Sequence, residues 1–207
     1  MKPDESLEQA ARQRGYAVVC GCDEAGAGPL MGPVCAGAVI LPPGCNIPGL
    51  DDSKKLTERK RDVLYELICA QAEAWSVGRA EAAEIDGLNI LNARLLAMNR
   101  AIEGLGRRAD LYLIDGNRDH GTKAAIEVPH ALLVGGDGRS ASIAAASILA
   151  KVSRDRYVTE VLDREYPQYQ FAKHKGYGTK LHYAMLDEFG PCPEHRKTFL
   201  KKWEAGR

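Results

Sequence analysis

The sequence contains no long hydrophobic run. No stretch approaches the roughly 18 apolar residues that span a membrane, and the opening segment MKPDESLEQAARQRG mixes both charge signs and lacks the apolar core of a secretory signal. These absences predict a cytoplasmic location. Hydrophobic residues make up 45% and charged residues 27% of the 207 positions, which is the balance of a single globular domain.

The cysteines lack the spacing of a metal-binding or redox motif. A single residue separates Cys20 from Cys22, where zinc sites and thioredoxin-like sites place two, and no paired partner motif follows. A zinc site is therefore not expected. In a chain without an export signal, we predict that the cysteines are reduced packing residues; they lie at positions 20, 22, 35, 45, 69 and 192.

The chain also lacks a net charge, because 28 Lys and Arg balance 28 Asp and Glu. The average hides a gradient. Residues 171–207 hold eight Lys and Arg against four Asp and Glu, a local charge of +4 that leaves −4 for the preceding residues. A basic end and an acidic body suit a metal-using enzyme that acts on a polyanion. A solvated surface with spare lysines explains the same pattern, and charge alone favours that simpler interpretation.

The expected elements indicate an α/β fold in which helices cover a mixed sheet. Apolar runs predict strands at 17–23, 32–41, 75–81, 110–115 and 131–137. Helical periodicity and capping residues predict helices at 4–14, 58–74, 88–105 and 140–166, with shorter helices after 179 and around 194–204. No repeat and no break in composition marks a linker.

Four acidic residues stand at predicted strand ends or turns: Asp23 and Glu24 in GCDEAGAGP, Asp115 in LIDGN, and Asp137 in VGGDGRS. Carboxylates gathered at strand ends repel one another unless protons or cations neutralise them. Mg²⁺ prefers such oxygen ligands. Asp23 and Glu24 share a metal only if the strand stops or twists between them, which the following glycines permit. Each acid alone is simply a turn residue, so only the combination indicates a metal site.

Several blocks follow one another along the chain: GCDEAGAGPLMGPVCAGAVIL, DDSKKL, EIDGLNIL, LIDGN, ASIAAASILAKVSRDR, PQYQFAKHKGYGT and EHRKTF. In order and spacing they resemble bacterial ribonuclease HII, from about residue 17 to residue 199. The resemblance implies a ribonuclease H-like mixed sheet flanked by helices, with a C-terminal helical extension. We therefore expect one domain at 1–207, with the catalytic core at about 17–165 and the basic extension at about 166–207. The related ribonuclease HIII carries an extra N-terminal domain for which this chain has no room.

The resemblance also implies a reaction. Asp23, Glu24, Asp115 and Asp137 stand at the positions of the family's metal-binding acids, which hold Mg²⁺ or Mn²⁺, two ions when substrate is bound. A metal-activated water attacks the phosphodiester 5′ to a ribonucleotide, leaving a 3′-hydroxyl and a 5′-phosphate. The expected partners are RNA–DNA hybrids and DNA duplexes with embedded ribonucleotides, and a monomer is the default state.

Recognition of RNA depends on the 2′-hydroxyl. In the family, the glycine-rich turn contacts that hydroxyl through its backbone, which here means Gly26, Ala27 and Gly28. Tyr177 in HKGYGT is expected to lie against the sugar on the 3′ side, although outside the family context it fits an ordinary surface tyrosine. The candidate phosphate contacts, each of which also fits a solvated side chain, are Lys54, Lys55, Lys175, His195 and Arg196.

Two further polar residues in these blocks are interpreted as structural. Asp155 stands four residues after Lys151 on an expected helix, where the two form an exposed ion pair worth about a few tenths of a kcal/mol. Asn89 is explained by packing and local hydrogen bonds.

Ala27 departs from the family pattern, which is Gly-Arg-Gly at this point. A guanidinium able to contact phosphate or brace nearby carboxylates is missing, so we expect weakened activity. Two alternatives stay open: an impaired or non-catalytic protein that binds hybrids, and another two-metal nuclease of the same fold.

We predict that Ala27→Arg raises the rate of hybrid cleavage, because it restores a guanidinium beside the acidic residues. Cleavage rates of the two proteins on one substrate test this prediction. Equal rates would contradict the interpretation of residue 27.

Overall fold

The computed structural model describes residues 2–206, which form a five-stranded sheet with helices on both faces. The strand order is β3-β2-β1-β4-β5. β1 pairs antiparallel with β2, as β2 does with β3, whereas β4 runs parallel to both β1 and β5. The predicted mixed sheet is confirmed, and its strands are β1 (Val19–Ala25), β2 (Val34–Ile40), β3 (Ala74–Ala80), β4 (Leu111–Asp115) and β5 (His130–Leu133).

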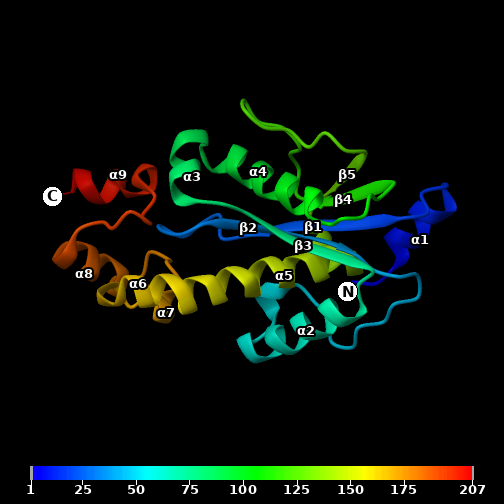
Figure 1. The fold of residues 1–207 in the computed structure, drawn as a ribbon, viewed down its shortest axis with the longest axis horizontal. Coiled ribbons are helices and arrows are strands. Elements are labelled where there is room, and N and C mark those ends of the chain that lie inside the picture. Colours follow the sequence, from blue (N-terminus) through cyan, green and yellow to red (C-terminus); the bar gives the residue numbers. More distant parts are fainter. Residues whose placement is uncertain (1, 207) are drawn as a thin grey trace.

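Two long helices lie on opposite faces of this sheet. Figure 1 shows α4 (Ile90–Glu103) above the strands and α5 (Ala141–Tyr157) below them. The alanine-rich α5 packs very closely, because a Cβ at Gly21 or Gly37 would collide with the backbone of the helix. Its N-terminus is capped by Ser140, whose side chain accepts a hydrogen bond from the backbone N–H of Ile143. Small residues on both surfaces thus fix the distance between α5 and the central strands.

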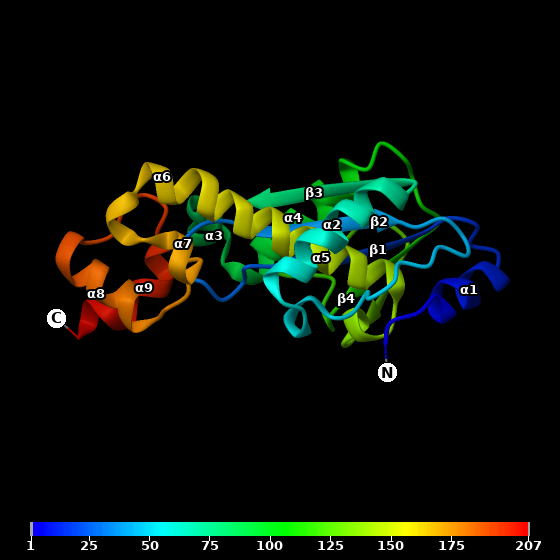
Figure 2. The ribbon, with the colours of Figure 1, turned by 90° about the horizontal axis from the view of Figure 1, so that it is seen from below.

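The remaining helices lie around this core. Figures 1 and 2 place α1 at one end of the sheet and the C-terminal helices at the other, while α2 packs on α5. Thr57 caps α2 by accepting a hydrogen bond from the backbone N–H of Lys60. The helices are α1 (Ser6–Gln13), α2 (Glu58–Gln71), α3 (Ala82–Leu88), α6 (Asp163–Glu165), α7 (Phe171–His174), α8 (Lys180–Phe189) and α9 (Lys197–Ala205).

Three element boundaries differ from the predictions. The helix expected at 88–105 is confirmed as α4, but it begins only after Asn89, which has a φ of 69° and caps α4 with its side chain. This cap confirms the local role given to Asn89. The short helix α3, which was not predicted, ends just before Asn89 at Leu88. The last predicted strand ends at Leu133, and Asp137 lies beyond it in a short 3-10 turn at Gly136–Gly138. The long helix expected at 140–166 consists of three parts. The α-helix α5 ends at Tyr157, a π-helical turn follows at Val158–Leu162, and α6 comes directly after it.

The cysteine prediction is confirmed. All six cysteines are free, and Cys20, Cys22 and Cys35 are buried in the strands. Within residues 2–206, no helix combines the length and the apolar character needed to cross a bilayer.

Three buried histidines form a cluster in the C-terminal segment. His182 Nε2 lies 3.0 Å from His195 Nε2, and the ring of His174 stacks on that of His182 at 4.4 Å. His182 Nδ1 lies 3.0 Å from the carbonyl oxygen of Tyr177, which only accepts, so this nitrogen carries the proton and Nε2 is the acceptor. His195 accepts from the backbone N–H of Cys192 at Nδ1 and therefore donates from Nε2. The network requires neutral imidazoles.

We predict that low pH destabilises this segment. Burial lowers the pKa of both His182 and His195 from 6.5 to about 4. Between these values the unfolded chain binds protons that the folded chain does not, so the free energy of unfolding falls as pH drops from 6.5 towards 4. The loss is at most about 1.4 kcal/mol per pH unit for each histidine.

The measurement is urea unfolding of the wild type and of His182→Gln across this pH range. The amide of Gln retains a donor for the Tyr177 carbonyl but does not titrate. Comparing the two pH slopes cancels the carboxylates that titrate in the same range. A variant with the same slope as the wild type would refute the prediction.

Candidate active site

The sheet topology brings the four acidic residues to one edge. β1 and β4 are parallel neighbours, with Cys22 opposite Ile114, so Asp23 and Glu24 near the C-terminal end of β1 lie beside Asp115, the last residue of β4. Asp137 reaches the same edge from the 3-10 turn after β5. That turn is tied to β4 because the backbone N–H of Gly136 donates a hydrogen bond to Asp115 Oδ1 at 2.6 Å. Residues more than a hundred positions apart therefore share one neighbourhood.

The carboxylates influence one another electrostatically. Burial raises the pKa of Asp23 well above its ordinary value, and the charges of Glu24 and Asp115 raise it further. Burial also raises the pKa of Glu24, against the opposing effect of Arg94. The pKa of Asp137 is raised by burial and then by Asp52 and Asp115. An additional positive charge at this edge would relieve all of these effects.

The acidic side chains do not form a ready-made cage. Among residues 2–206, no three His, Cys, Asp or Glu side chains stand close enough to hold one metal ion. Other partners engage them: Asp23 Oδ1 accepts from the backbone N–H of Glu24, and Asp137 Oδ2 lies 3.7 Å from Lys54 Nζ. Glu24 Oε1 lies 2.6 Å from Arg94 Nη2. Mutual repulsion and these contacts keep the carboxylates apart.

One atom shows that the residues fit a cation. Glu24 Oε2 is buried and has no hydrogen-bond partner among the described residues. A buried carboxylate oxygen without a partner is costly, and coordination to a cation would satisfy it. The donor atoms here are all carboxylate oxygens, which suits Mg²⁺ or Mn²⁺.

The glycine-rich loop beside the acids is held by two buried arginines. Arg196 donates to four backbone carbonyls of the loop, including those of Gly26 at 2.7 Å and Ala27 at 3.0 Å. Arg154, from α5, donates to the carbonyls of Met31 and Pro33. Gly26 has a φ of 91°, and a Cβ there would collide with the Arg154 side chain. The loop conformation therefore depends on both guanidinium groups.

This finding corrects two predicted phosphate contacts. His195 and Arg196 are 1% and 0% exposed, and their polar atoms bind the histidine cluster and the loop backbone. They are too deeply buried to meet a phosphate. The sequence gives no local sign of this, because a basic pair in a basic segment is typical of a surface.

The other predicted substrate contacts are more exposed. Lys54, whose side chain is 80% exposed, lies at the acidic edge. Lys55 Nζ lies 3.6 Å from Asp51, and Lys175 Nζ contacts Thr159 and Glu58 away from the acids. Tyr177 is 42% exposed and lies beside Gly28, so this ring and the glycine-rich loop share one surface.

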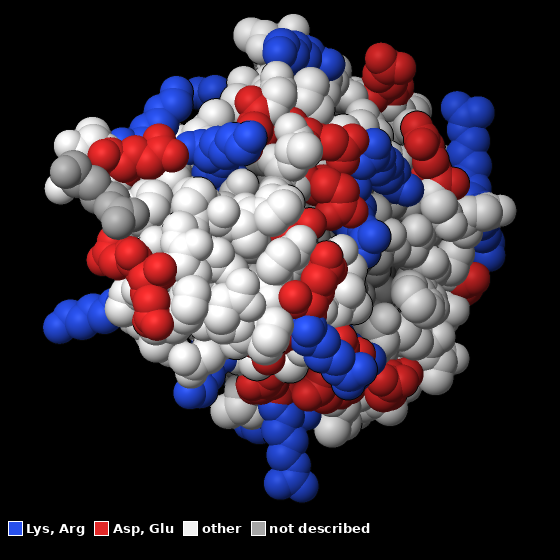
Figure 3. Space-filling view, turned by 60° about the vertical axis from the view of Figure 1, so that its left-hand side comes forward, with Lys and Arg blue, Asp and Glu red and all other residues white. Residues whose placement is uncertain are grey.

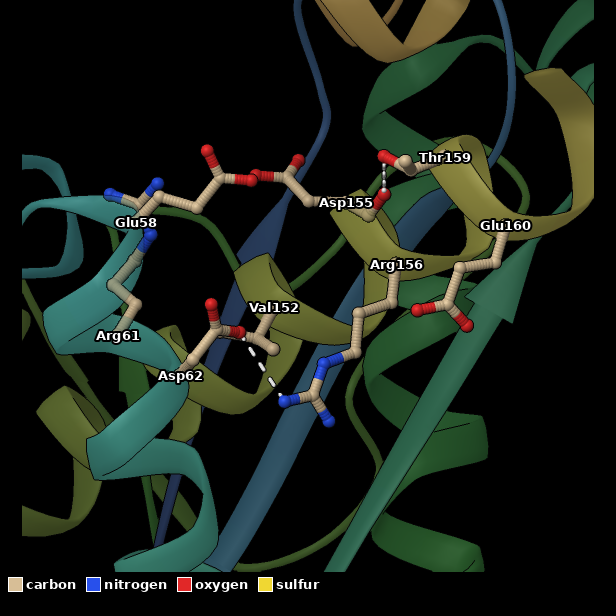
Figure 4. Close-up of a pocket in the computed structure, with 8 residues that line it drawn as sticks. All are labelled: Glu58, Arg61, Asp62, Val152, Asp155, Arg156, Thr159 and Glu160. Atoms are coloured by element: carbon tan, nitrogen blue, oxygen red, sulfur yellow. Dashed lines mark hydrogen bonds and ion pairs between the residues drawn. The ribbon is translucent and has the colours of Figure 1, made fainter.

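A separate hollow of about 270 Å³ lies between α2 and α5. Figure 4 shows Asp155 and Glu58 pointing towards each other across it. Lys151 binds Asp155 at 2.9 Å as predicted, but Asp155 is only 7% exposed, so the pair is not the exposed one expected. Arg156 pairs with Asp62. The hollow contains none of the four acids at the sheet edge. Its other arginine, Arg61, donates to the backbone carbonyls of Ser53 and Leu56.

Sequence analysis missed Arg94 and Arg154. Both lie on helices whose other residues are mostly apolar or small. A charged side chain in such a helix was the one feature of the sequence that could have drawn attention to them. On the face shown in Figure 3, acidic and basic side chains intermingle, and neither sign forms a continuous patch. Charge distribution alone does not locate the site.

Comparisons with known proteins bear on the family and the fold of this chain. A family model described as Ribonuclease HII matches residues 20–204. Ribonuclease HII of Aliivibrio salmonicida is 56% identical over 90% of this chain and 87% of its own length, and that of Syntrophotalea carbinolica is 50% identical over 93% and 90%. Ribonuclease H2 from Pyrococcus horikoshii OT3 superposes with a TM-score of 0.71 and 25% identity, covering 91% of this chain and 98% of that one. Bst-RNase HIII, solved in complex with Mn²⁺, has the same fold at a TM-score of 0.70 and 20% identity, covering 95% of this chain and 72% of its own.

We predict that Arg196→Ala lowers the free energy of unfolding by about 3–5 kcal/mol, because it leaves buried carbonyl groups without donors. Urea denaturation measures this loss. Arg100→Ala is the control, since Arg100 is partly exposed and pairs with the side chain of Glu84; we expect it to cost about 1 kcal/mol or less. Equal losses in the two variants would contradict the role given to Arg196.

Proposed function

This chain belongs to the ribonuclease HII family, and on that basis we propose that Asp23, Glu24, Asp115 and Asp137 jointly bind the divalent cations of its reaction. The protein is a ribonuclease H endonuclease, and enzymes of this class depend on metal ions. The observation that carries the proposal is the meeting of four carboxylates at one sheet edge, with a buried oxygen of Glu24 left unsatisfied. Among the alternatives considered, a protein that only binds hybrids is not favoured.

The proposed ions are Mg²⁺ or Mn²⁺, two when substrate is bound. The Mn²⁺ complex of the structural neighbour Bst-RNase HIII and the all-oxygen donor set support this choice. Bound metal supplies the activated water and the Lewis-acid stabilisation for attack on the phosphodiester. The contribution of the chain is to hold the carboxylates at one edge and to orient the substrate there.

The proposed substrates are RNA–DNA hybrids and DNA duplexes with embedded ribonucleotides, cut 5′ to the ribonucleotide to leave a 3′-hydroxyl and a 5′-phosphate. Arg196 engages the carbonyl oxygens of Gly26 and Ala27. No hydrogen bond within the described residues uses the N–H of Ala27 or Gly28, so these groups are available to a 2′-hydroxyl.

The neighbouring surface supports the same proposal. The exposed ring of Tyr177 lies beside Gly28, where it would pack against the sugar on the 3′ side. Lys54 lies at the acidic edge, where we propose that it contacts a phosphate. Lys55 and Lys175 pair with other carboxylates, and we propose them only as phosphate contacts at the periphery of the site. Ala27 lacks the family guanidinium, and we expect a correspondingly weaker grip on phosphate.

The organisation of the chain forms part of the proposal. We propose one domain, because Arg154 from the core and Arg196 from the C-terminal extension hold the same loop. A monomer is the proposed active form, since one chain contains every proposed site residue. A cytoplasmic location fits the six free cysteines.

The test is cleavage of a duplex containing one ribonucleotide, with both product ends mapped, next to an all-DNA duplex. We expect a single cut 5′ to the ribonucleotide and no cleavage of DNA. Asp115→Asn should reduce the rate at least about a hundredfold, because even residues that only support a metal ligand cost up to that much.

Asp119→Asn is the matched control, since it makes the same change in the loop after β4, where Asp119 binds His120 and His130. We expect near wild-type rates from it. Undiminished cleavage by Asp115→Asn would overturn the proposed metal site.

A further inference from the structure

Glu24 on β1 forms an ion pair with an arginine from the helix layer above the sheet. Arg94 lies on α4, and its Nη2 atom is 2.6 Å from Glu24 Oε1 at the end of β1. The side chains are 33% and 13% exposed, so water screens the pair only in part. Arg94 therefore places a positive charge directly beside a largely buried carboxylate.

This ion pair is incomplete. Glu24 Oε2 and Arg94 Nε are both buried, and neither has a hydrogen-bond partner among the described residues. Arg100, on the same helix, forms the complete version: its two terminal nitrogens each lie 2.8 Å from a different oxygen of Glu84. A two-point arginine–carboxylate pair is the stronger arrangement. The Arg94 pair thus holds Glu24 by one oxygen and leaves the other available.

Arg94 also borders a small hollow. It has a volume of about 30 Å³ and is lined by apolar side chains of α4 and by Asn117 and Arg118. A shift of the guanidinium towards Asn117 would lengthen its contact with Glu24. The repulsion of Arg94 by an arriving dication would drive such a movement.

We propose that Arg94 is a displaceable counter-ion of Glu24, which a divalent cation must displace before it coordinates this carboxylate. Arg94 is accordingly a positioning residue that sets the metal affinity of the enzyme. The inference rests on the proposed role of Glu24 as a metal ligand. Because Arg94 and the metal compete for the same carboxylate, the free energy of metal binding is reduced by the free energy needed to break the ion pair.

The first test is titration of the chelator-treated, full-length protein with Mn²⁺ alone, followed by calorimetry or by the EPR signal of free Mn²⁺. We expect Arg94→Met to bind Mn²⁺ at least about tenfold more tightly than the wild type, equivalent to about 1.4 kcal/mol. Arg100→Met, which breaks the complete pair on the same helix, should leave the affinity unchanged.

Arg118→Met separates displacement from a general effect of charge. It removes a guanidinium lining the same hollow, and we expect an effect well below that of Arg94→Met. Equal tightening by the two variants would mean that only the local field matters and would overturn the inference. Unchanged affinity in Arg94→Met would overturn it as well.

A second measurement uses the wild type and does not depend on the folding of any variant. In spectra of protein with ¹⁵N-labelled arginine, addition of Mg²⁺ should shift the Nε–H signal of Arg94 and leave that of Arg100 in place. An unmoved Arg94 signal at saturating Mg²⁺ would refute displacement. If the wild type binds no Mn²⁺, or if Asp115→Asn binds it equally well, the proposed metal site itself fails. If the protein binds metal tightly while the Arg94 signal does not shift, only the proposed counter-ion role of Arg94 is refuted, and the proposed metal site stands.

Discussion

Negative charge buried at the edge of a sheet is the constraint on which the rest of this structure depends. Burial, and after it the charge of Asp115, raises the pKa of Asp23, Glu24 and Asp137 alike. Such a cluster is tolerated only when protons or compensating positive charges neutralise it. Lys54 and Arg94 supply part of that charge from opposite sides. Both contacts are partial, as the proposed binding of a divalent cation requires.

The scaffold holds this cluster by close packing. Gly21 on β1 and Gly37 on β2 admit α5 to the sheet at a distance that any side chain would prevent. The same helix then carries Arg154 beneath the glycine-rich loop. The position of the loop relative to the acids is therefore set by the helix that packs against the acid-bearing strand. Catalytic geometry and core packing are coupled through α5.

The C-terminal segment contributes from inside the molecule. Its basic residues suggest a surface for a polyanion, yet His195 and Arg196 are buried. Within the segment, the neutral imidazole of His182 binds the backbone carbonyl of Tyr177, and Arg196 ties the segment to the loop. The extension thus helps to shape the proposed substrate surface, in addition to carrying positive charge. The face shown in Figure 3 has no continuous basic patch, so a polyanion bound on that face would rely on local contacts.

Local patterns in the sequence were sufficient for most elements, because apolar periodicity and caps such as Thr57 and Ser140 act within a few residues. The ordered blocks were sufficient for the family and for the four candidate acids. Only tertiary structure placed Asp137 in a turn beyond β5, joined Arg94 to Glu24, and buried Arg196 under a loop 170 residues earlier in the chain. These are long-range electrostatic contacts, and no local pattern encodes them. A charged residue in sequence looks the same whether solvent, a carboxylate or a backbone carbonyl receives its hydrogen bonds.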